Sequence, residues 1–297
     1  MTTRQLRVIS SVMITWAVLC FATQNVAHCQ LESFPAMDAK KRTGLMLTGE
    51  RKARNETCAT RCSAKGNSVT MPLIVVGFVG GRVKADDVRH PEVQLSAELR
   101  RRYPRGVYAE VFANRKRETA FRQILRWLDT DGNGTLTVGE KQQARIVIYG
   151  HSWGASETVT LARELARSSI PVLLTIQVDS IAKPGEDDGL IPPNVANALN
   201  FYQAEGVLHG RAEIVASDPL RTEIIGNFRM MYKDYPINCD AFPWFARTFM
   251  KSHIEIENDS RIWRQAALLI DSELSQPVST DQTQPSSASP LAPIASH

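Results

Sequence analysis

The sequence predicts a three-layer α/β fold, in which a mostly parallel central sheet carries helices on both faces. Two observations lead to this prediction. Short apolar runs alternate along the chain with longer segments that have helical spacing, which is the pattern of repeated strand-helix-strand units. The runs are apolar throughout rather than on one side only, as expected of parallel strands that are buried on both faces.

Four apolar runs are expected to form strands of this sheet. MPLIVVGF (71–78) and ARIVIYG (144–150) have the composition of buried strands, VYAEVFA (107–113) alternates as a strand does, and PVLLTIQVD (171–179) is the most continuous run. AEIVAS (212–217) is a further strand candidate. Because α/β proteins gather their chemistry at the carboxyl ends of such strands, the search for a site begins there.

Five segments have the apolar spacing of helices. The segment 91–103 opens with a proline, and 117–129 is amphipathic. A third helix follows the strand at 144–150, a fourth starts on the prolines of 192–203, and a fifth covers 260–271.

The predicted folded domain spans 70–274, and the chain outside it differs in composition. Residues 1–29 have the layout of a secretory signal peptide, with a positive start and an apolar run (8–22) that is short for a membrane span. Residues 30–69 are polar, and 275–297 are rich in Ser, Pro, Thr and Gln and cannot bury a core. We therefore expect a secreted or periplasmic protein with no stable membrane span after signal cleavage.

Charge gives no sign of a nucleic-acid partner. The formal net charge is +4 over 297 residues, and short basic clusters are spread among Glu and Asp, which is typical of solvated helix faces. Cys58, Cys62 and Cys239 have no histidine beside them, so these cysteines are not expected to bind zinc. Their disulfide pairing stays open.

The stretch Gly150-His151-Ser152-Trp153-Gly154 is a G-x-S-x-G sequence between a predicted strand and a predicted helix. In this context the serine of such a sequence sits on a sharp turn as a nucleophile. The two glycines permit the turn without a Cβ clash, and the helix N-terminus favours developing negative charge. We therefore predict that Ser152 is the nucleophile of a hydrolase.

A serine hydroxyl needs a base before it can act as a nucleophile. Among the histidines, His253 follows the last predicted strand and is the predicted base. His209 precedes a predicted strand element and is the alternative. In this role His253 would take the proton of Ser152.

The acid that orients the base is expected after a late strand, between the serine and the histidine in chain order. Asp179 ends the strand that follows the serine turn and is the predicted acid. Asp218 ends the next strand candidate and is its rival, while Asp187 and Asp188 lie in a loop and rank third.

The oxyanion of a serine hydrolase is stabilised by backbone amides. The strand at 71–78 runs into a glycine-rich loop, Gly77-Phe78-Val79-Gly80-Gly81, at the same end of the sheet as Ser152. The amide of Val79 or Gly80, together with that of Trp153, is the predicted oxyanion hole.

These residues resemble the α/β-hydrolase superfamily, and more narrowly its secreted lipase- and esterase-like bacterial members. The resemblance covers about 71–270 and rests on ARIVIYGHSWGASE, VLLTIQVDS and KSHIEIENDSRIW. It implies an eight-stranded pattern trimmed at its start, with Ser152, Asp179 and His253 as a catalytic triad. The superfamily's commoner arrangement places the acid one strand later, which would favour Asp218.

DTDGNGTLTVGE (129–140) matches the calcium-loop pattern D-x-[DN]-x-[DN]-G-x₅-E, so we predict a calcium ion with a structural role. Little chain separates this loop from the strand at 144–150, which argues against a signalling switch. The alternative is ordinary turn chemistry with a capping box at Thr137-x-x-Glu140. The predicted calcium ligands are Asp129, Asp131, Asn133, Thr135, Thr137 and Glu140.

The sequence therefore predicts a serine hydrolase of the esterase or lipase type, which acts on small-molecule or lipid esters through an acyl-enzyme. The segment 228–250, dense in aromatic residues and Met just before His253, is expected to line a pocket or pack a core. The alternatives are a thioesterase or peptidase with the same triad and a non-catalytic, calcium-dependent binding protein. The sequence carries no signal for an oligomeric state.

Overall fold

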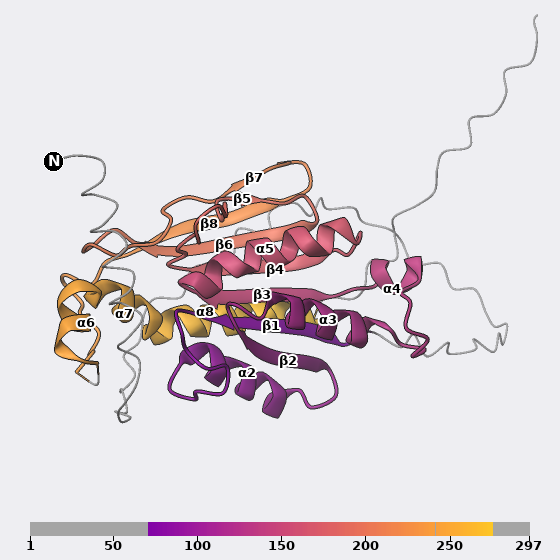
Figure 1. Cartoon of the computed structure of the whole chain (residues 1–297), viewed down its shortest axis with the longest axis horizontal. Coiled ribbons are helices and arrows are strands. Elements are labelled where there is room, and N and C mark those ends of the chain that lie inside the picture. Colours follow the sequence, from indigo (N-terminus) through magenta and orange to yellow (C-terminus); the bar gives the residue numbers. More distant parts are fainter. Residues whose placement is uncertain (1–70, 241, 276–297) are drawn as a thin grey trace, which may run out of the picture.

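The structure is a computed structural model of the chain, and it describes residues 71–240 and 242–275 (Figure 1). The predicted signal peptide (1–29), the polar segment (30–69) and residues 276–297 of the tail lie outside the described residues, as do two of the three cysteines beyond the signal segment. Export and the disulfide pairing therefore stay predictions. Within the described residues, no helix combines the length and the apolar character needed to cross a membrane.

Six strands form the central sheet, in the order β2-β1-β3-β4-β6-β8. Every neighbouring pair is parallel, so the predicted α/β fold with a mostly parallel sheet is confirmed. The strands span β1 (Leu73–Val79), β2 (Val107–Ala113), β3 (Ile146–His151), β4 (Val172–Val178), β6 (Val195–Gln203) and β8 (Glu223–Met230).

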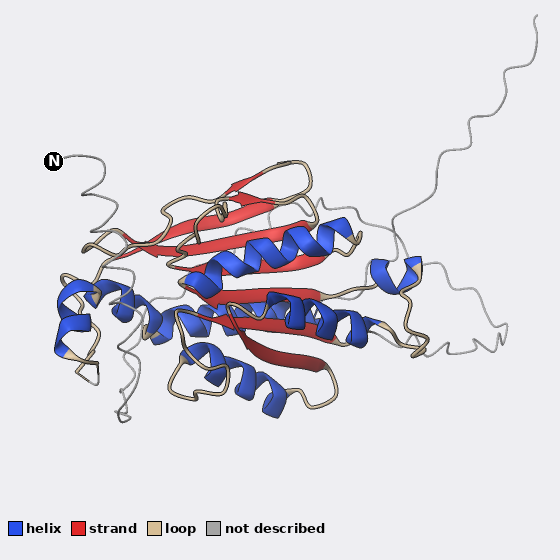
Figure 2. Ribbon diagram, viewed as in Figure 1, coloured by secondary structure: helices blue, strands red, loops and turns tan. Residues whose placement is uncertain are grey.

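Helices cover both faces of the sheet (Figure 2). Alternate residues of a strand point to opposite faces. In β1, Ile74, Val76 and Phe78 pack into a core with α3 and α5, whereas Leu73 and Val75 pack into a second core with α2 and α8. The helices span α2 (Pro91–Arg102), α3 (Arg117–Leu128), α4 (Val138–Gln142), α5 (Trp153–Arg167), α6 (Trp244–Phe249), α7 (Lys251–Glu257) and α8 (Ser260–Ser275).

The predicted elements of the first half of the domain match the structure closely. The expected strands at 71–78, 107–113, 144–150 and 171–179 correspond to β1, β2, β3 and β4. Four of the five expected helices correspond to α2, α3, α5 and α8.

The predicted helix at 192–203 is wrong, because this segment forms strand β6. The side chains of Val195, Ala198 and Leu199 have helical spacing, but β6 lies between β4 and β8 and is paired with both. Asn200 is also buried and donates a hydrogen bond from Nδ2 to the Asn227 side chain, at 3.1 Å. Pairing with two neighbouring strands thus overrides the local helical pattern.

The strand expected at 212–217 is much shorter in the structure. Only Val215–Ala216 (β7) is extended, and it pairs with β5 (Leu190–Ile191) in a separate two-stranded sheet. The sixth strand of the central sheet is β8, which the sequence analysis did not anticipate.

The loops after β1 and β3 open at the carboxyl edge of the sheet. Because β2 lies beside one edge of β1 and β3 beside the other, the chain changes direction across the sheet at this point. Open α/β sheets form their ligand crevices at such switch points. Ser152 directly follows β3, and Gly80 directly follows β1.

Candidate active site

Ser152 occupies a sharp turn between β3 and α5. Its backbone is left-handed, with φ 58° and ψ −126°, a conformation that a non-glycine residue adopts only when its surroundings hold it there. The two flanking glycines allow chain segments to cross closely. A Cβ at Gly150 would lie 2.5 Å from the carbonyl carbon of Gly154, and a Cβ at Gly154 would lie 2.3 Å from the carbonyl oxygen of Phe78.

His253 lies in the first turn of α7 and faces Ser152. Its Nε2 is 3.0 Å from Ser152 Oγ, and its Nδ1 is 2.6 Å from Asp179 Oδ2. With Nδ1–H donating to the carboxylate, Nε2 is free to accept the serine proton. The structure therefore brings together the three residues that the sequence analysis singled out as nucleophile, base and acid.

Asp179 is fully buried directly after β4, where four donors surround its carboxylate. Oδ1 accepts from the backbone amides of Gln203 (3.2 Å) and Gly210 (2.8 Å), while Oδ2 accepts from Gln203 Nε2 (2.8 Å) and from His253. Burial alone would raise the pKa of Asp179, but the hydrogen bonds and charge of His253 and the bond from Gln203 hold it below its usual 3.8. The carboxylate is thus ionised at neutral pH.

The loop after β1 passes directly beside the serine. A Cβ added to Gly80 would lie 3.0 Å from Ser152 Cβ and 3.1 Å from the His151 carbonyl oxygen, so only glycine fits without displacement. Asn114 Nδ2 anchors this loop by donating to the carbonyl oxygens of Val79 (3.2 Å) and Gly81 (2.5 Å). Trp153 opens α5 on the other side of Ser152.

The rival residues lie elsewhere. Asp218 accepts from the amide of Leu220 at 3.0 Å, in the turn before β8. Asp188 is buried and binds Ser180 Oγ (2.5 Å) and the Arg211 guanidinium.

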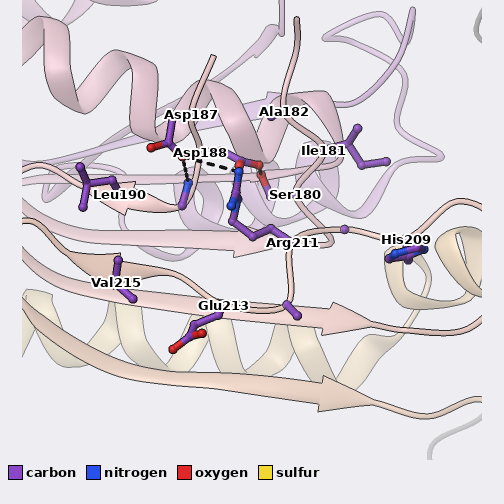
Figure 3. A pocket seen from close by; sticks show the side chains of 13 residues that line it. Ser180, Ile181, Ala182, Asp187, Asp188, Leu190, His209, Arg211, Glu213 and Val215 are labelled. Carbon is purple, nitrogen blue, oxygen red and sulfur yellow. Dashed lines mark hydrogen bonds and ion pairs between the residues drawn. The ribbon is translucent and has the colours of Figure 1, made fainter. Parts of the chain in front are cut away.

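Figure 3 shows a pocket of about 710 Å³ whose lining includes chain neighbours of Asp179. Its wall includes Ser180, which follows Asp179, and His209, which precedes Gly210. Ile181 also lines it, and the amide of Ile181 donates to the carbonyl oxygen of Ser152 at 3.3 Å. The pocket therefore borders the triad, and its charged lining suits polar groups. The charged and ionisable lining residues are Asp187, Asp188, His209, Arg211 and Glu213.

The aromatic segment before His253 is divided between core and surface. Tyr232 is buried and donates from its hydroxyl to Asp259 Oδ2 at 3.0 Å. Tyr235 and Trp244 are 70% and 71% exposed. The sequence alone did not separate these two environments, because both use large apolar side chains.

Gln203 and His151 are site residues that the sequence analysis did not assign. The sequence predicts a helix at Gln203, whereas in the structure this residue ends strand β6 beside Asp179. The ring of His151 lies 4.5 Å from that of His253, centroid to centroid, so the two rings are in contact.

The loop at 129–140 folds tightly around Asp129. Its Oδ1 accepts from the amide of Asn133 at 3.1 Å and its Oδ2 from that of Gly134 at 2.9 Å. Gly134 has a φ of 82°, in the left-handed region that the sixth position of a calcium loop requires. Carboxylate oxygens of Asp129, Asp131 and Glu140 all lie within 4.8 Å of one another.

Glu140 closes the loop from its far end. Its oxygens accept from the amides of Thr137 (2.9 Å) and Thr130 (2.8 Å), and Thr137 caps α4 in a capping box with Glu140. These hydrogen bonds, that of the Thr137 amide first, lower the pKa of Glu140 to about 2. Both the calcium-loop interpretation and the capping-box alternative agree with this geometry.

Comparison with known proteins gives only distant likenesses to solved structures. No family model matches the chain, and no curated protein matches it. One similar solved structure is RedJ with a PEG molecule bound in the active site, at 12% sequence identity over 74% of this chain and 98% of that chain, with a TM-score of 0.32. Another is a cutinase-like protein from Cryptococcus sp., at 11% identity over 70% of this chain and 97% of that chain, with a TM-score of 0.34.

A third is an iodinated complex of acetyl xylan esterase, at 10% identity over 68% of this chain and 99% of that chain, with a TM-score of 0.31. Identities and TM-scores this low assign neither a family nor an activity.

Proposed function

We propose that the protein is a serine hydrolase that cleaves carboxylic esters. The observation that carries this proposal is the hydrogen-bonded chain from Ser152 Oγ to His253 Nε2 (3.0 Å) and from His253 Nδ1 to Asp179 Oδ2 (2.6 Å). Ser152, where this hydrogen-bonded chain begins, has a positive φ and lies at the carboxyl edge of the parallel sheet. Such a constellation is recognised by geometry and roles rather than by sequence position.

In the proposed mechanism, His253 Nε2 takes the proton of Ser152 as Oγ attacks the ester carbonyl. Asp179 holds the imidazole in the tautomer with Nδ1 protonated and stabilises the imidazolium that forms. The resulting oxyanion would be stabilised by the amide of Trp153 and that of Val79 or Gly80.

His253 then protonates the departing alkoxide, which leaves as an alcohol. The acyl group stays bonded to Ser152 Oγ. A water molecule that has given its proton to His253 attacks this acyl group, and His253 returns the proton to Oγ as the acid is released.

A fluorophosphonate probe tests the nucleophile. We expect the wild-type protein to be labelled covalently, labelling to be lost in Ser152→Ala and His253→Ala to label far more slowly. Ser168→Ala, at the opposite end of α5, is the matched control and should label as the wild type does. Equal labelling of wild type and Ser152→Ala, or labelling of neither, would refute the proposal.

The class of acyl substrate is tested with matched leaving groups. Small-molecule and lipid esters are the proposed substrates, and a p-nitrophenyl ester series of increasing chain length separates them. A thioester and a peptide anilide serve as the alternatives that the same triad would support. Faster turnover of either alternative than of every ester would reassign the enzyme, while no turnover of any would favour a binding protein.

We also propose that the loop at 129–140 binds one calcium ion in a structural role. The side chains offer hard oxygen donors, as calcium requires. The observation in support is that carboxylate oxygens of Asp129, Asp131 and Glu140 converge in a loop where Gly134 has a positive φ. A bound ion would offset the mutual repulsion of these carboxylates. For a lone loop in an exported protein we expect a Kd of roughly 10⁻⁴–10⁻³ M, the range of extracellular calcium modules.

Thermal unfolding with calcium or with a chelator tests this site. At a calcium concentration about tenfold above Kd, the expected stabilisation is ~1.4 kcal/mol, and Glu140→Gln should abolish it. Magnesium, with its stricter geometry, is the control ion. Identical midpoints in calcium and chelator would leave the loop as a capped turn.

A further inference from the structure

Four ionisable side chains are buried together beneath the serine turn. They come from the start of α2, the end of β3 and the end of α7, and we call them the buried cluster. Each has less than a tenth of its surface exposed. None of the four takes part in the proposed proton transfers, although the ring of His151 packs against that of His253. The buried cluster consists of His90, Glu92, His151 and Glu257.

The carboxylate of Glu92 is the unusual member of the cluster. Its residue is 0% exposed, and neither Oε1 nor Oε2 has a hydrogen-bond partner among the described residues. His151 Nδ1 lies 4.0 Å from Glu92 Oε1 and 3.8 Å from Glu257 Oε1. His90 Nδ1 lies 2.5 Å from Glu257 Oε1. Buried polar groups are nearly always satisfied in folded proteins, so a partner for Glu92 is missing.

Both glutamates are held in place through their backbones. The Tyr149 hydroxyl donates to the carbonyl oxygen of Glu92 at 2.7 Å, and Trp263 Nε1 donates to that of Glu257 at 2.6 Å. These bonds anchor the backbone at both positions, and both residues are buried, at 0% and 3% exposure.

The cluster lacks positive charge for its two carboxylates. Burial, followed by the charge of Glu257, raises the pKa of Glu92 to about 8. Burial also disfavours the charged form of Glu257, but the charges of His151 and His90 and the bond from His90 lower its pKa to about 2. When both carboxylates are ionised, one protonated histidine balances only one of them, and an unpaired buried charge is strongly destabilising. Burial without a partner therefore keeps Glu92 uncharged unless a cation joins the cluster.

We propose that the buried cluster binds one divalent transition-metal ion of the zinc type, with His90, Glu92 and Glu257 as ligands and His151 Nδ1 as the fourth donor. The ligand atoms of the first three residues all lie within 4.8 Å of one another. Bonds of about 2.0–2.1 Å in a tetrahedral site place ligand atoms roughly 3.3 Å apart. The contacts of 2.5, 3.8 and 4.0 Å lie on either side of this value.

The donor set selects the class of metal. Two imidazole nitrogens and two carboxylates suit zinc and its first-row neighbours, whereas calcium takes oxygen donors. Two neutral histidines, two carboxylates and a dication also sum to zero charge, as a buried site requires. The other ring nitrogen of His90 lies 3.9 Å from Asp87 Oδ2, in the position from which a carboxylate orients a metal-bound histidine.

Such an ion would be structural. Four protein ligands leave no open coordination position for a reacting water, and the cluster is closed to solvent. The ion would join the start of α2 to the end of α7, the short helix that also carries His253 at the site. This inference is independent of the proposed esterase activity and of the loop at 129–140.

The full-length protein is stripped with a chelator, incubated with zinc, desalted and analysed for bound metal. We expect about one zinc ion per wild-type chain, and affinity lowered by at least about tenfold in Glu92→Gln and in Glu257→Gln. Glu255→Gln, which removes another buried carboxylate of α7, and Glu140→Gln in the calcium loop should bind zinc as the wild type does. Cobalt in place of zinc should give the visible absorption of a tetrahedral site.

A variant could bind little zinc simply because it is poorly folded. Thermal unfolding of each protein in chelator and in zinc separates this cause from the loss of a ligand. In chelator and above about pH 8, where the Glu92 carboxyl is ionised, Glu92→Gln should melt above the wild type, because it loses an unpartnered buried charge. In zinc this order should reverse, since only the wild type gains from the ion. Failure of the wild type to retain stoichiometric zinc, or equal retention by wild type and both glutamine variants, would overturn the proposal.

Discussion

Replacing Asp179 with asparagine removes one charge and exchanges one acceptor oxygen for an NH₂ group. The surrounding donors dictate which oxygen is exchanged. Oδ1 accepts from two backbone amides, those of Gln203 (3.2 Å) and Gly210 (2.8 Å), which cannot turn away. The carbonyl oxygen of the asparagine must therefore take the Oδ1 position, and its NH₂ group must take the Oδ2 position facing His253.

This orientation inverts the tautomer of the base. His253 Nδ1, now 2.6 Å from the position of a donor rather than an acceptor, becomes an acceptor, so the ring proton moves to Nε2. Nε2 lies 3.0 Å from Ser152 Oγ and can no longer take the serine proton. An aspartate-to-asparagine change with this effect lowers kcat roughly 10⁴-fold, or about 5 kcal/mol of transition-state stabilisation.

The assay is steady-state hydrolysis of a short p-nitrophenyl ester near neutral pH, with separate kcat and KM. The loss should fall on kcat, because Asp179 is fully buried and acts through His253. Asp218→Asn, in the turn before β8, is the matched control and should stay within about twofold of the wild type. A kcat for Asp179→Asn within tenfold of the wild type, or an equal loss in Asp218→Asn, would refute this reasoning.

Three further predictions concern stability. Gly154→Ala should lower the free energy of unfolding by about 1–3 kcal/mol in urea titrations, because its Cβ would lie 2.3 Å from the Phe78 carbonyl oxygen. An unchanged free energy of unfolding would contradict this close contact. Leu128→Ala, which removes a fully buried side chain of α3, should cost about 2–5 kcal/mol by the same measurement, and a cost under ~1 kcal/mol would show that this core position is loosely packed. The folded-state pKa of Asp179 lies below its usual 3.8, so the stabilisation from its carboxylate is present above that pH and is lost as pH falls through the lowered pKa. The urea midpoint of the wild type should therefore drop more steeply below pH 3.8 than that of Asp179→Asn, and parallel curves would count against the shift.

The sequence predicted the elements whose local pattern and tertiary role agree. β1, β3 and β4 are apolar throughout because they are buried on both faces. The sharp turn at Ser152 needs two glycines, and these are visible in the sequence as G-x-S-x-G. β6 was missed since Val195, Ala198 and Leu199 have helical spacing, and only pairing with β4 and β8 makes the segment a strand. β8 gave no signal because it is a half-buried edge strand with a glycine inside it.

The site residues also divide into those predictable from local sequence and those that depend on tertiary contacts. Ser152, His253 and Asp179 were singled out from chain order and from their places after strands, which sequence records. The Gln203 contact with Asp179 depended on a strand that was predicted as a helix. Glu92 and Glu257 meet only in the fold, because they are far apart in the chain and their surroundings contain no metal-binding spacing.

The loop at 129–140 lies at the opposite end of the molecule from the serine turn (Figure 1). Strand β3 separates the two, since the loop precedes its first residue and Ser152 follows its last; its six residues span about 20 Å at ~3.3 Å per residue. This separation makes the end of the molecule with the loop a suitable attachment point for immobilisation on a solid support. A cysteine introduced at the exposed Val138 of α4, which is not a predicted calcium ligand, and coupled to a bead would leave the edge with Ser152 facing the solution. That edge would stay open to substrates too large to enter between protein and support.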